Sequence, residues 1–167
     1  METQISDSMT DDKLDQLISF SVGDEDYGVD IQKVKEVIKI RNITKLPKAP
    51  VFVKGVINLR GDIIPVLDLR EKFGLEQAEY GDSTRIIVAE VEGRSVGMVV
   101  VSVSHVIRIA HDQIEPPPEM AGGISAEYLR GVGKLDEKLI VLLNIDKILS
   151  TNEKIELEGL DELKKAS

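Results

Sequence analysis

Few residues in this sequence could carry out acid–base or nucleophilic chemistry. It has two histidines, His105 and His111, and no cysteine. A nucleophilic triad needs a hydroxyl or thiol next to a His base, with a third group that orients the base. Ser104 directly precedes His105 on an expected strand, so their side chains would point to opposite faces. We therefore predict that the protein is not an enzyme, and we assign no catalytic residue.

Motifs for metal and phosphate binding are also incomplete. Asp24-Glu-Asp26 lacks the spacing of a calcium loop, and the absence of cysteine excludes thiolate-ligated metals. Gly131-Val-Gly-Lys134 resembles part of a phosphate loop, but Tyr128 stands where that motif requires its first glycine. No Ser or Thr follows the lysine. We expect no metal site and interpret these stretches as a solvated turn and a strand.

An internal repeat organises the elements around these positions. Gly55–Leu69 alternates like two strands joined at Gly61-Asp62, and the pattern returns 76 residues later in Gly131–Ile145. Upstream, Tyr27–Ile40 returns 69 residues later in Val96–Ile109. A unit that is written twice predicts two similar halves of one body.

The composition favours strands. The chain has 167 residues, of which 42% are hydrophobic but only 4% aromatic, so its core must be aliphatic. The short alternating segments amount to about ten strands, roughly five in each half. Such a set usually closes into a small barrel, which removes exposed sheet edges. We therefore predict an all-β fold with two small five-stranded barrels side by side and short helical turns.

This pattern divides the chain into three parts. Residues 1–14 are expected to form a mobile tail and residues 15–150 a single domain, with the first barrel at about 15–74 and the second at about 84–150. Residues 151–167 form an acidic C-terminal tail, for which a weak helix and a frayed end are both open. The apolar run Val96–Val101 is expected to be a strand that is covered on both faces where the halves meet.

The charge of the chain excludes two classes of partner. Its formal net charge is −9, whereas a phosphate backbone or an anionic membrane surface attracts clustered Lys and Arg. No apolar run is long enough to span a membrane, and the N-terminus is acidic and polar rather than signal-like. We expect a cytoplasmic protein without nucleic-acid binding and without direct membrane contact.

Glu36 and Arg60 are polar residues that a β-sheet core does not require. Glu36 begins one expected strand and Arg60 ends another, so the two would pair if those strands are neighbours. An exposed ion pair of this kind contributes little to stability. The repeat places His105 at the position of Glu36 and Asp136 at that of Arg60, so we hypothesise that these two also approach each other.

Several motifs together resemble the CheW family. They are Asp26–Ile31, Lys35–Val37, Leu46-Pro47, Phe52–Gly61, Ile64–Arg70, Val96–Val100 and Tyr128–Gly131. The most specific part is Asn58-Leu-Arg-Gly61 with the following Pro65-Val-Leu-Asp68. The similarity extends from about Leu17 to Leu149.

This resemblance implies SH3-like barrels, no cofactor and the role of an adaptor in bacterial chemotaxis. Such proteins link the cytoplasmic tips of chemoreceptors (methyl-accepting proteins) to the regulatory domain of the histidine kinase CheA. Carried over by position, the receptor-binding residues would be Val34, Glu36, Ile38, Asn58 and Arg60. The kinase-binding residues would be Ile43, Leu46, Glu119 and Met120. The glycines of structural turns would be Gly55, Gly61, Gly97 and Gly131.

Two departures from the family pattern concern the second half. Val101 stands where these proteins usually carry Asp, and His105 stands where an acidic residue is common. The apolar residues of the two binding sets could equally be ordinary core residues. Two other functions also remain open at this point. One is an adaptor of a different receptor–kinase pathway, such as surface motility, and the other is a ligand-binding or enzymatic module that uses the groove between the halves.

Overall fold

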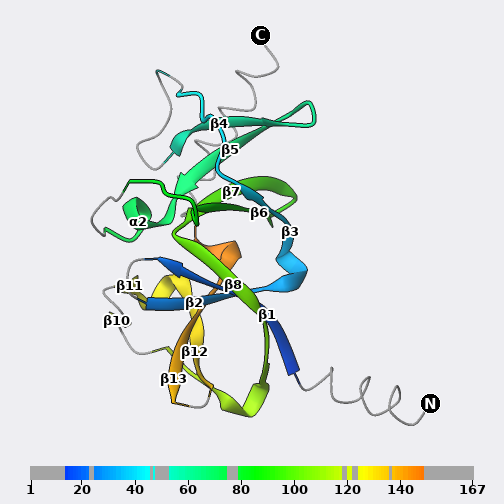
Figure 1. The fold of residues 1–167 in the computed structure, drawn as a ribbon. Coiled ribbons are helices and arrows are strands. Elements are labelled where there is room, and N and C mark those ends of the chain that lie inside the picture. Colours follow the sequence, from blue (N-terminus) through cyan, green and yellow to red (C-terminus); the bar gives the residue numbers. More distant parts are fainter. Residues whose placement is uncertain are drawn as a thin grey trace, which may run out of the picture.

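The computed structural model consists mainly of short β-strands (Figure 1). It describes residues 14–22, 25–45, 47, 53–74, 79–117, 120–121, 124–135 and 137–148. The strands are β1 (Leu14–Val22), β2 (Glu25–Asp30), β3 (Val34–Lys39), β4 (Val53–Leu59), β5 (Asp62–Asp68), β6 (Arg85–Val91), β7 (Arg94–Val100), β8 (Ser102–Ala110), β9 (Ile114–Glu115), β10 (Met120–Ala121), β11 (Ile124–Ser125), β12 (Leu129–Leu135) and β13 (Lys138–Leu143). The helical turns are η1 (Ile31–Lys33), α2 (Leu69–Lys72), η2 (His111–Gln113), η3 (Ala126–Tyr128) and η4 (Ile145–Lys147).

Two sheets lie one above the other in Figure 1 and form two barrel-like units. The upper one has the order β3-β6-β7-β5-β4 and is called here the β4 barrel. The lower one has the order β8-β1-β2-β13-β12-β9 and is called the β12 barrel. This arrangement confirms the predicted all-β fold with two small barrels side by side.

The two barrels are not the two halves of the sequence. The β4 barrel takes β3, β4 and β5 from the first half but β6 and β7 from the second, while the β12 barrel takes β1 and β2 from the first half. The expectation that residues 15–74 and 84–150 each fold into a barrel is therefore wrong. Each half exchanges its first hairpin with the other, because η1 carries the chain from one sheet to the other after β2.

The repeat is visible in the strand register. Val66 lies beside Gly97 where β5 runs parallel to β7, and Leu142 lies beside Gly28 where β13 runs parallel to β2. Both hairpins β4–β5 and β12–β13 also carry an irregularity at the same place in the repeat. The strand order of one sheet is thus the order of the other with every strand replaced by its repeat equivalent, β9 being additional.

Each barrel closes through the segment that follows its edge strand. In the β4 barrel, Thr44 forms an isolated bridge with Val56 of β4, and both backbone N–H to O distances are 2.9 Å. In the β12 barrel, β9 follows β8 through the single turn η2 and pairs with β12. Both closures bring a backbone carbonyl close to a glycine of the opposite strand.

Close approach, not turn formation, explains three of the four predicted turn glycines. A Cβ at Gly55 would lie 2.3 Å from the Thr44 carbonyl oxygen, and one at Gly131 would lie 2.6 Å from the Glu115 carbonyl oxygen. A Cβ at Gly97 would lie 2.9 Å from the Cγ2 methyl carbon of Ile86 on β6. These three lie inside β4, β12 and β7, so their prediction as turn residues is wrong. Gly61 does lie in a turn, with φ of 93°.

The largest apolar core lies between the two barrels. It contains Phe20, Tyr27 and Phe73 and the apolar residues of both sheets that face each other. A smaller core around Ile64 and Val66 fills the β4 barrel, and another around Leu17, Ile107 and Leu142 fills the β12 barrel. Strand β7 contributes to the inter-barrel core and to the interior of the β4 barrel, which confirms the predicted coverage of both faces for Val96–Val100. Val101, the last residue of the predicted run, lies beyond β7 and is half-buried.

The predicted tails fall almost entirely outside the described residues. Only Leu14 of the expected N-terminal tail is described, and it is the first residue of β1. Residues 151–167 are outside the described part of the chain. Within that part, none of the helices has the length and apolar character needed to cross a membrane.

Candidate functional site

The edge strand β3 carries the residues expected to face a receptor. Its side chains alternate between half-buried and exposed along Val34–Lys39. An irregularity between Val34 and Glu36 divides the strand. Val34 packs against the inter-barrel core, whereas Ile38 packs against the interior of the β4 barrel. Both apolar residues therefore contribute to packing, and the exposed positions of the strand are Lys35, Val37 and Lys39.

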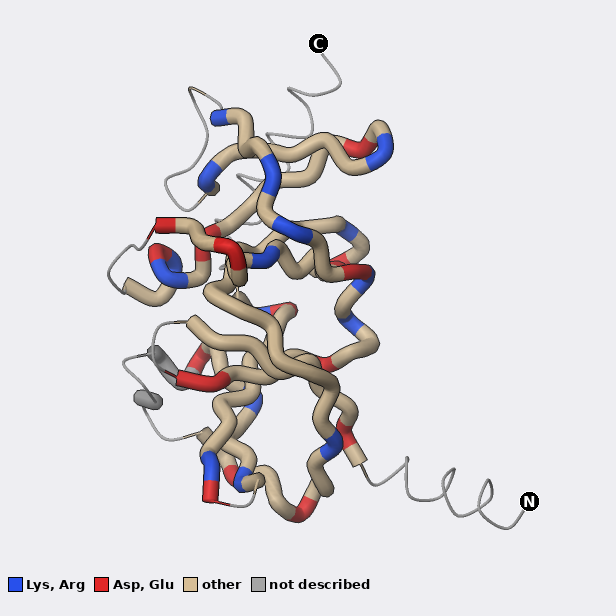
Figure 2. The backbone as a smooth tube through the Cα atoms, viewed as in Figure 1, with Lys and Arg blue, Asp and Glu red and all other residues tan. Residues whose placement is uncertain are grey.

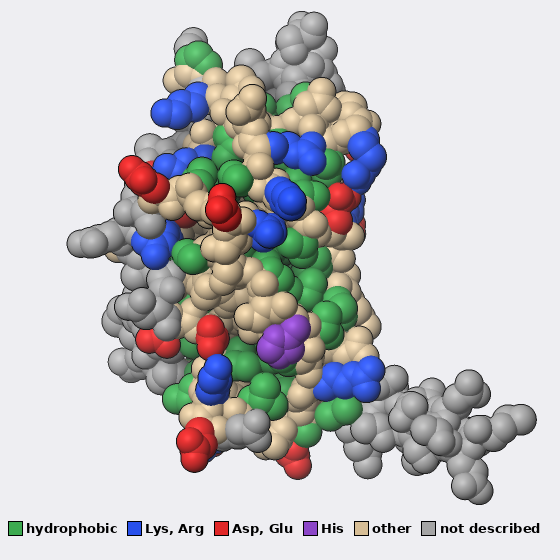
Figure 3. All heavy atoms as spheres, in the orientation of Figure 1, with side chains coloured by type: hydrophobic (Ala, Val, Ile, Leu, Met, Phe, Trp, Pro, Cys, Tyr) green, Lys and Arg blue, Asp and Glu red, His purple; other side chains and the backbone are tan. Residues whose placement is uncertain are grey.

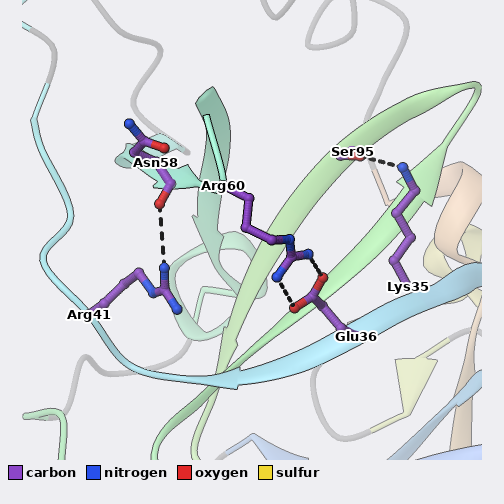
Figure 4. Close-up of polar contacts among 6 residues, drawn as sticks. All are labelled: Lys35, Glu36, Arg41, Asn58, Arg60 and Ser95. Carbon is purple, nitrogen blue, oxygen red and sulfur yellow. Dashed lines mark hydrogen bonds and ion pairs between the residues drawn. The ribbon is translucent and has the colours of Figure 1, made fainter. Parts of the chain in front are cut away.

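Glu36 and Arg60 form a bidentate ion pair (Figure 4). Arg60 Nη1 donates to Glu36 Oε1 at 3.3 Å, and Arg60 Nη2 donates to Glu36 Oε2. The Arg60 hydrogen bond and positive charge lower the pKa of the Glu36 carboxyl, and Arg41 acts in the same direction. The predicted pairing of these two residues is confirmed, and it ties the β4–β5 turn to the edge strand.

The turn that presents Arg60 is held by its neighbours. Arg60 has φ of 53° and Gly61 has φ of 93°, which are the positive values that a tight two-residue hairpin turn requires. Asn58 Oδ1 accepts a hydrogen bond of 2.9 Å from the Gly61 N–H. Arg41 Nη1 donates to the Asn58 carbonyl oxygen at 3.4 Å (Figure 4). The side chain of Asn58 thus supports the turn.

Sequence reasoning missed two exposed apolar residues at the margin of the inter-barrel core. Val37 is 37% exposed on β3, and Val106 is 50% exposed on β8. They pair with Ile87 and Ile18, which are both buried members of that core. Residues paired across a sheet share a face, so both valines lie on the side that turns toward the other barrel. The signal was available, because the two valines are 69 residues apart and so are repeat equivalents.

The residues expected to face the kinase are only partly described. Ile43 is half-buried and packs against the interior of the β4 barrel. Leu46 and Glu119 lie outside the described residues, and Met120 opens β10 without a described side chain. These four residues stay predictions.

A hollow of about 430 Å³ adjoins Ile43. Its lining among the described residues includes the cations Arg41, Lys45 and Lys54 as well as Asp68, Glu79 and Tyr80. The Tyr80 hydroxyl donates to Asp68 Oδ2 at 3.2 Å. Burial and then the Asp68 charge raise the pKa of the Tyr80 phenol above its usual range. The Asp68 carboxylate also accepts the Arg70 N–H at 2.9 Å, so its role here is to cap α2.

The two histidines do not form a reactive constellation. His105 is exposed, and its hypothesised partner Asp136 lies outside the described residues. His111 Nε2 lies 3.3 Å from Asp15 Oδ2, to which Arg130 Nη2 also donates at 2.7 Å. This cluster joins β1, η2 and β12. In the part of the chain that the structure describes, no group of three or more His, Cys, Asp or Glu side chains could hold a metal ion.

Val101, one of the two departures from the family pattern, lies where the chain passes from one sheet to the other. Val101 is half-buried, and its N–H donates to the Ser21 carbonyl oxygen at 2.9 Å where the chain passes from β7 to β8. The Ser102 hydroxyl lies 2.7 Å from the Ser21 hydroxyl at the same point. A carboxylate at position 101 is therefore not needed to join the two sheets there.

The chain was also compared with known proteins. The family model described as a CheW-like domain matches residues 16–153. The chain is 42% identical over 138 residues to the chemotaxis protein CheW of Klebsiella aerogenes, covering 83% of each protein. It is 36% identical over 138 residues to the protein FrzA of Myxococcus xanthus, covering 81% of this chain and 86% of that protein.

A solved structure has the same fold. It is the crystal structure of the scaffolding protein TtCheW from Thermoanaerobacter tengcongensis, with a TM-score of 0.77 and 39% identity. The alignment covers 83% of this chain and 94% of that one. Both sequence and structure agree over most of the chain, and the chain therefore belongs to the CheW-like domain family.

Proposed function

We propose that this chain is a non-catalytic adaptor that couples the cytoplasmic tips of chemoreceptors to the regulatory domain of the histidine kinase CheA. The observation that carries this proposal is the match of the CheW-like family model to residues 16–153. The relatives and the solved neighbour are named as chemotaxis and scaffolding proteins. The chain is a chemotaxis adaptor, and the identity of its two partners is the finer step proposed here.

The receptor surface is proposed to be the margin of the inter-barrel core along β3. There the Glu36–Arg60 pair stands beside the exposed Val37, and Val34 and Ile38 form the packed base beneath. An apolar strip flanked by fixed polar groups suits a helix that lies in a groove. Val106, the repeat equivalent of Val37, extends this margin on β8.

The kinase surface is proposed to be the end of the β4 barrel around Ile43, with Leu46 beside it in sequence, together with Glu119 and Met120. Support comes from the hollow that Ile43 lines, whose lining contains neither Glu36 nor Arg60 and shares Arg41 with the receptor side. Two separate surfaces allow one adaptor to hold two partners at once. In an array, later contacts become intramolecular, so each contact can be weak on its own.

A catalytic or ligand-binding alternative is not favoured. The family whose model spans most of this chain consists of adaptor and scaffold proteins. Glu36 of β3 pairs with Arg60 of the β4–β5 turn, and His111 contacts the Asp15 carboxylate. We propose the cytoplasm as the site of action, because chemoreceptor tips lie there in the family that the sequence resembles.

The proposal is tested by mapping two footprints on labelled protein by NMR. One titration uses a receptor-tip fragment and the other uses the CheA regulatory domain, both from the same organism as this chain. We expect shifts around Glu36, Val37 and Arg60 with the receptor fragment, and shifts around Ile43 with the kinase domain. Absence of shifts with either partner would contradict the coupling function while leaving the fold unaffected.

A further inference from the structure

The segment that contains β3 has a charge opposite to that of the whole protein. Residues 31–45 carry five cations and one anion, in a chain whose formal net charge is −9. The cations are Lys33, Lys35, Lys39, Arg41 and Lys45, and the anion is Glu36. Figure 2 shows Lys and Arg recurring along the backbone of β3 and the segment that follows it. Positive charge is thus concentrated on one edge of the β4 barrel.

Most of these cations have no carboxylate partner among the described residues. Lys33 Nζ pairs with Asp146 Oδ2 at 3.1 Å. Glu36, the anion of this segment, forms its ion pair with Arg60. Lys35 Nζ donates to the neutral Ser95 Oγ at 2.7 Å, and Arg41 contacts only a backbone carbonyl (Figure 4). For Lys39 and Lys45 no partner is found in the described part of the chain. Elsewhere, lysines at positions 54 and 134 pair with Glu71 and Glu115.

A further cation reinforces the centre of this edge. Arg85 on β6 lies directly opposite Lys39 in the strand register, and its guanidinium contacts only backbone carbonyls. We call Lys35, Lys39, Arg41 and Arg85 the β3 cation edge. From Lys35 to Arg41 it extends at most about 20 Å along β3 and the two residues that follow it, given a rise of about 3.3 Å per residue. Figure 3 shows Lys and Arg side chains gathered over this part of the molecule, with hydrophobic side chains between them.

Charge complementarity gives the chemistry of the partner. We infer that the β3 cation edge docks an acidic segment of the receptor tip, whose carboxylates flank an apolar residue that contacts Val37. This inference rests on the proposed function and adds to it the negative charge of the receptor segment that binds at β3. The Glu36–Arg60 pair is internally neutral, so it sets the position of the partner, while the unpaired cations attract it.

The alternative anionic partners fit the surface less well. A nucleic acid or an anionic membrane carries negative charge over a much larger area than a short acidic segment, so it would also face the rest of the chain, whose charge outside residues 31–45 is even more negative than −9. Strands β3 and β6, which carry Lys35, Lys39 and Arg85, contain no aromatic side chain on which bases could stack. Val37 is exposed between Lys35 and Lys39 on β3. An apolar residue with a charged rim is typical of a small protein–protein contact.

The experiment compares two double variants with equal change of charge. Lys35→Glu with Lys39→Glu reverses the β3 cation edge, and Lys138→Glu with Lys147→Glu reverses two exposed lysines of the β12 barrel and η4. Binding to the receptor-tip fragment is measured by calorimetry over a series of salt concentrations. The CheA regulatory domain, a DNA duplex, and vesicles of equal parts phosphatidylcholine and phosphatidylglycerol serve as further ligands. Circular dichroism verifies that both variants are folded.

We expect the wild-type affinity for the receptor fragment to fall with rising salt. The Lys35/Lys39 variant should bind that fragment at least about tenfold more weakly at low salt, with little remaining salt dependence. The Lys138/Lys147 variant should bind like wild type, and binding to the CheA domain should be equal for all three proteins.

Three outcomes would overturn the inference and can be told apart. If wild type binds the receptor fragment but the Lys35/Lys39 variant binds equally well, the cation edge has no role, and the proposed coupling function stands. If wild type does not bind the receptor fragment at all, the proposed function fails and this inference fails with it. Binding of the wild type to DNA or to the anionic vesicles, lost in the Lys35/Lys39 variant, would replace the acidic protein segment with that ligand.

Discussion

Arg60 and Glu36 hold each other through both guanidinium Nη atoms and both carboxylate oxygens, although 24 residues separate them in the chain. The arginine lies in the β4–β5 turn and the glutamate on the edge strand β3. A bidentate pair fixes the relative orientation of two side chains as well as their distance. The pair therefore presents a defined polar shape on a surface that is otherwise made by a strand edge.

Replacing Arg60 tests whether this shape is used for recognition. Arg60→Ala should leave the melting temperature nearly unchanged, because both side chains are at the surface and solvent screens their attraction. Receptor-fragment binding should weaken, and Arg60→Lys should not restore it, because lysine cannot form the two parallel hydrogen bonds. Thermal unfolding and calorimetric binding measure the two effects. Full binding by Arg60→Ala would exclude a recognition role for the pair.

The ion pair also predicts a pH dependence with a definite sign. Because Arg60 lowers the pKa of Glu36 in the folded state, the stabilisation it provides is present above the unfolded pKa of about 4.3. It is lost as the pH falls through the lower folded value. An NMR titration of the Glu36 carboxyl carbon should give a higher midpoint in Arg60→Ala than in wild type. Equal midpoints would show that the pair does not form in solution.

Tyr27 is a buried residue whose hydroxyl finds no hydrogen-bond partner among the described residues. Its ring lies 6.0 Å from both Phe20 and Phe73 in the inter-barrel core. Tyr27→Phe should therefore leave the free energy of unfolding unchanged or raise it, whereas Tyr27→Ala should lower it by about 3–5 kcal/mol. Urea denaturation checks both. A clear loss of stability in Tyr27→Phe would reveal a partner for the hydroxyl.

The same burial predicts behaviour at alkaline pH. Burial raises the pKa of Tyr27 to about 12, so the folded state holds the neutral phenol better than the unfolded chain does. The contribution to stability is complete below the unfolded value of about 10 and is lost as the pH rises from there through about 12. Wild type should lose more stability over this window than Tyr27→Phe, as measured by urea denaturation at each pH.

One glycine that approaches a carbonyl and one that does not provide a matched test of packing. Gly131→Ala places a methyl group 2.6 Å from the Glu115 carbonyl oxygen and should destabilise the fold by about 1–3 kcal/mol. Gly81→Ala is the control, since a Cβ there meets nothing within 4 Å and its φ is not in the left-handed region. The free energies of unfolding should differ accordingly. Equal stabilities would show that the β9–β12 contact is loose.

The exchange of hairpins predicts that the two halves of the chain depend on each other. Fragments 1–74 and 79–167 should each fail to fold alone, because each barrel takes two strands from the other half. Mixed together, they should restore the β-sheet signal and the cooperative unfolding of the whole chain. Circular dichroism and size-exclusion chromatography measure this. A folded single fragment would contradict the interdependence.

Much of the candidate site could be predicted from residue types and spacing. The turn at Gly61 and the burial of the run Val96–Val100 follow from alternation and turn chemistry, and the structure confirms them. The pairing of Glu36 with Arg60 was expected only if their strands are neighbours. The structure forms the pair although β3 and β4 are at opposite ends of the sheet order. The exposure of Val37 was not predicted, because a valine on a strand is usually buried. Whether it is covered depends on how far the opposite barrel extends, and local sequence does not contain that information.

The sequence by itself determined the β-structure, the aliphatic core and the existence of two equivalent units, since periodicity and repeat are properties of the chain alone. Only the tertiary structure decided which hairpin belongs to which barrel. Because both copies of the unit have the same alternation, the pattern by itself does not assign either first hairpin to one of the two sheets. In the structure, the connections after β2 and β7 cross between the sheets. The exchanged hairpins then contribute to one core that both barrels share.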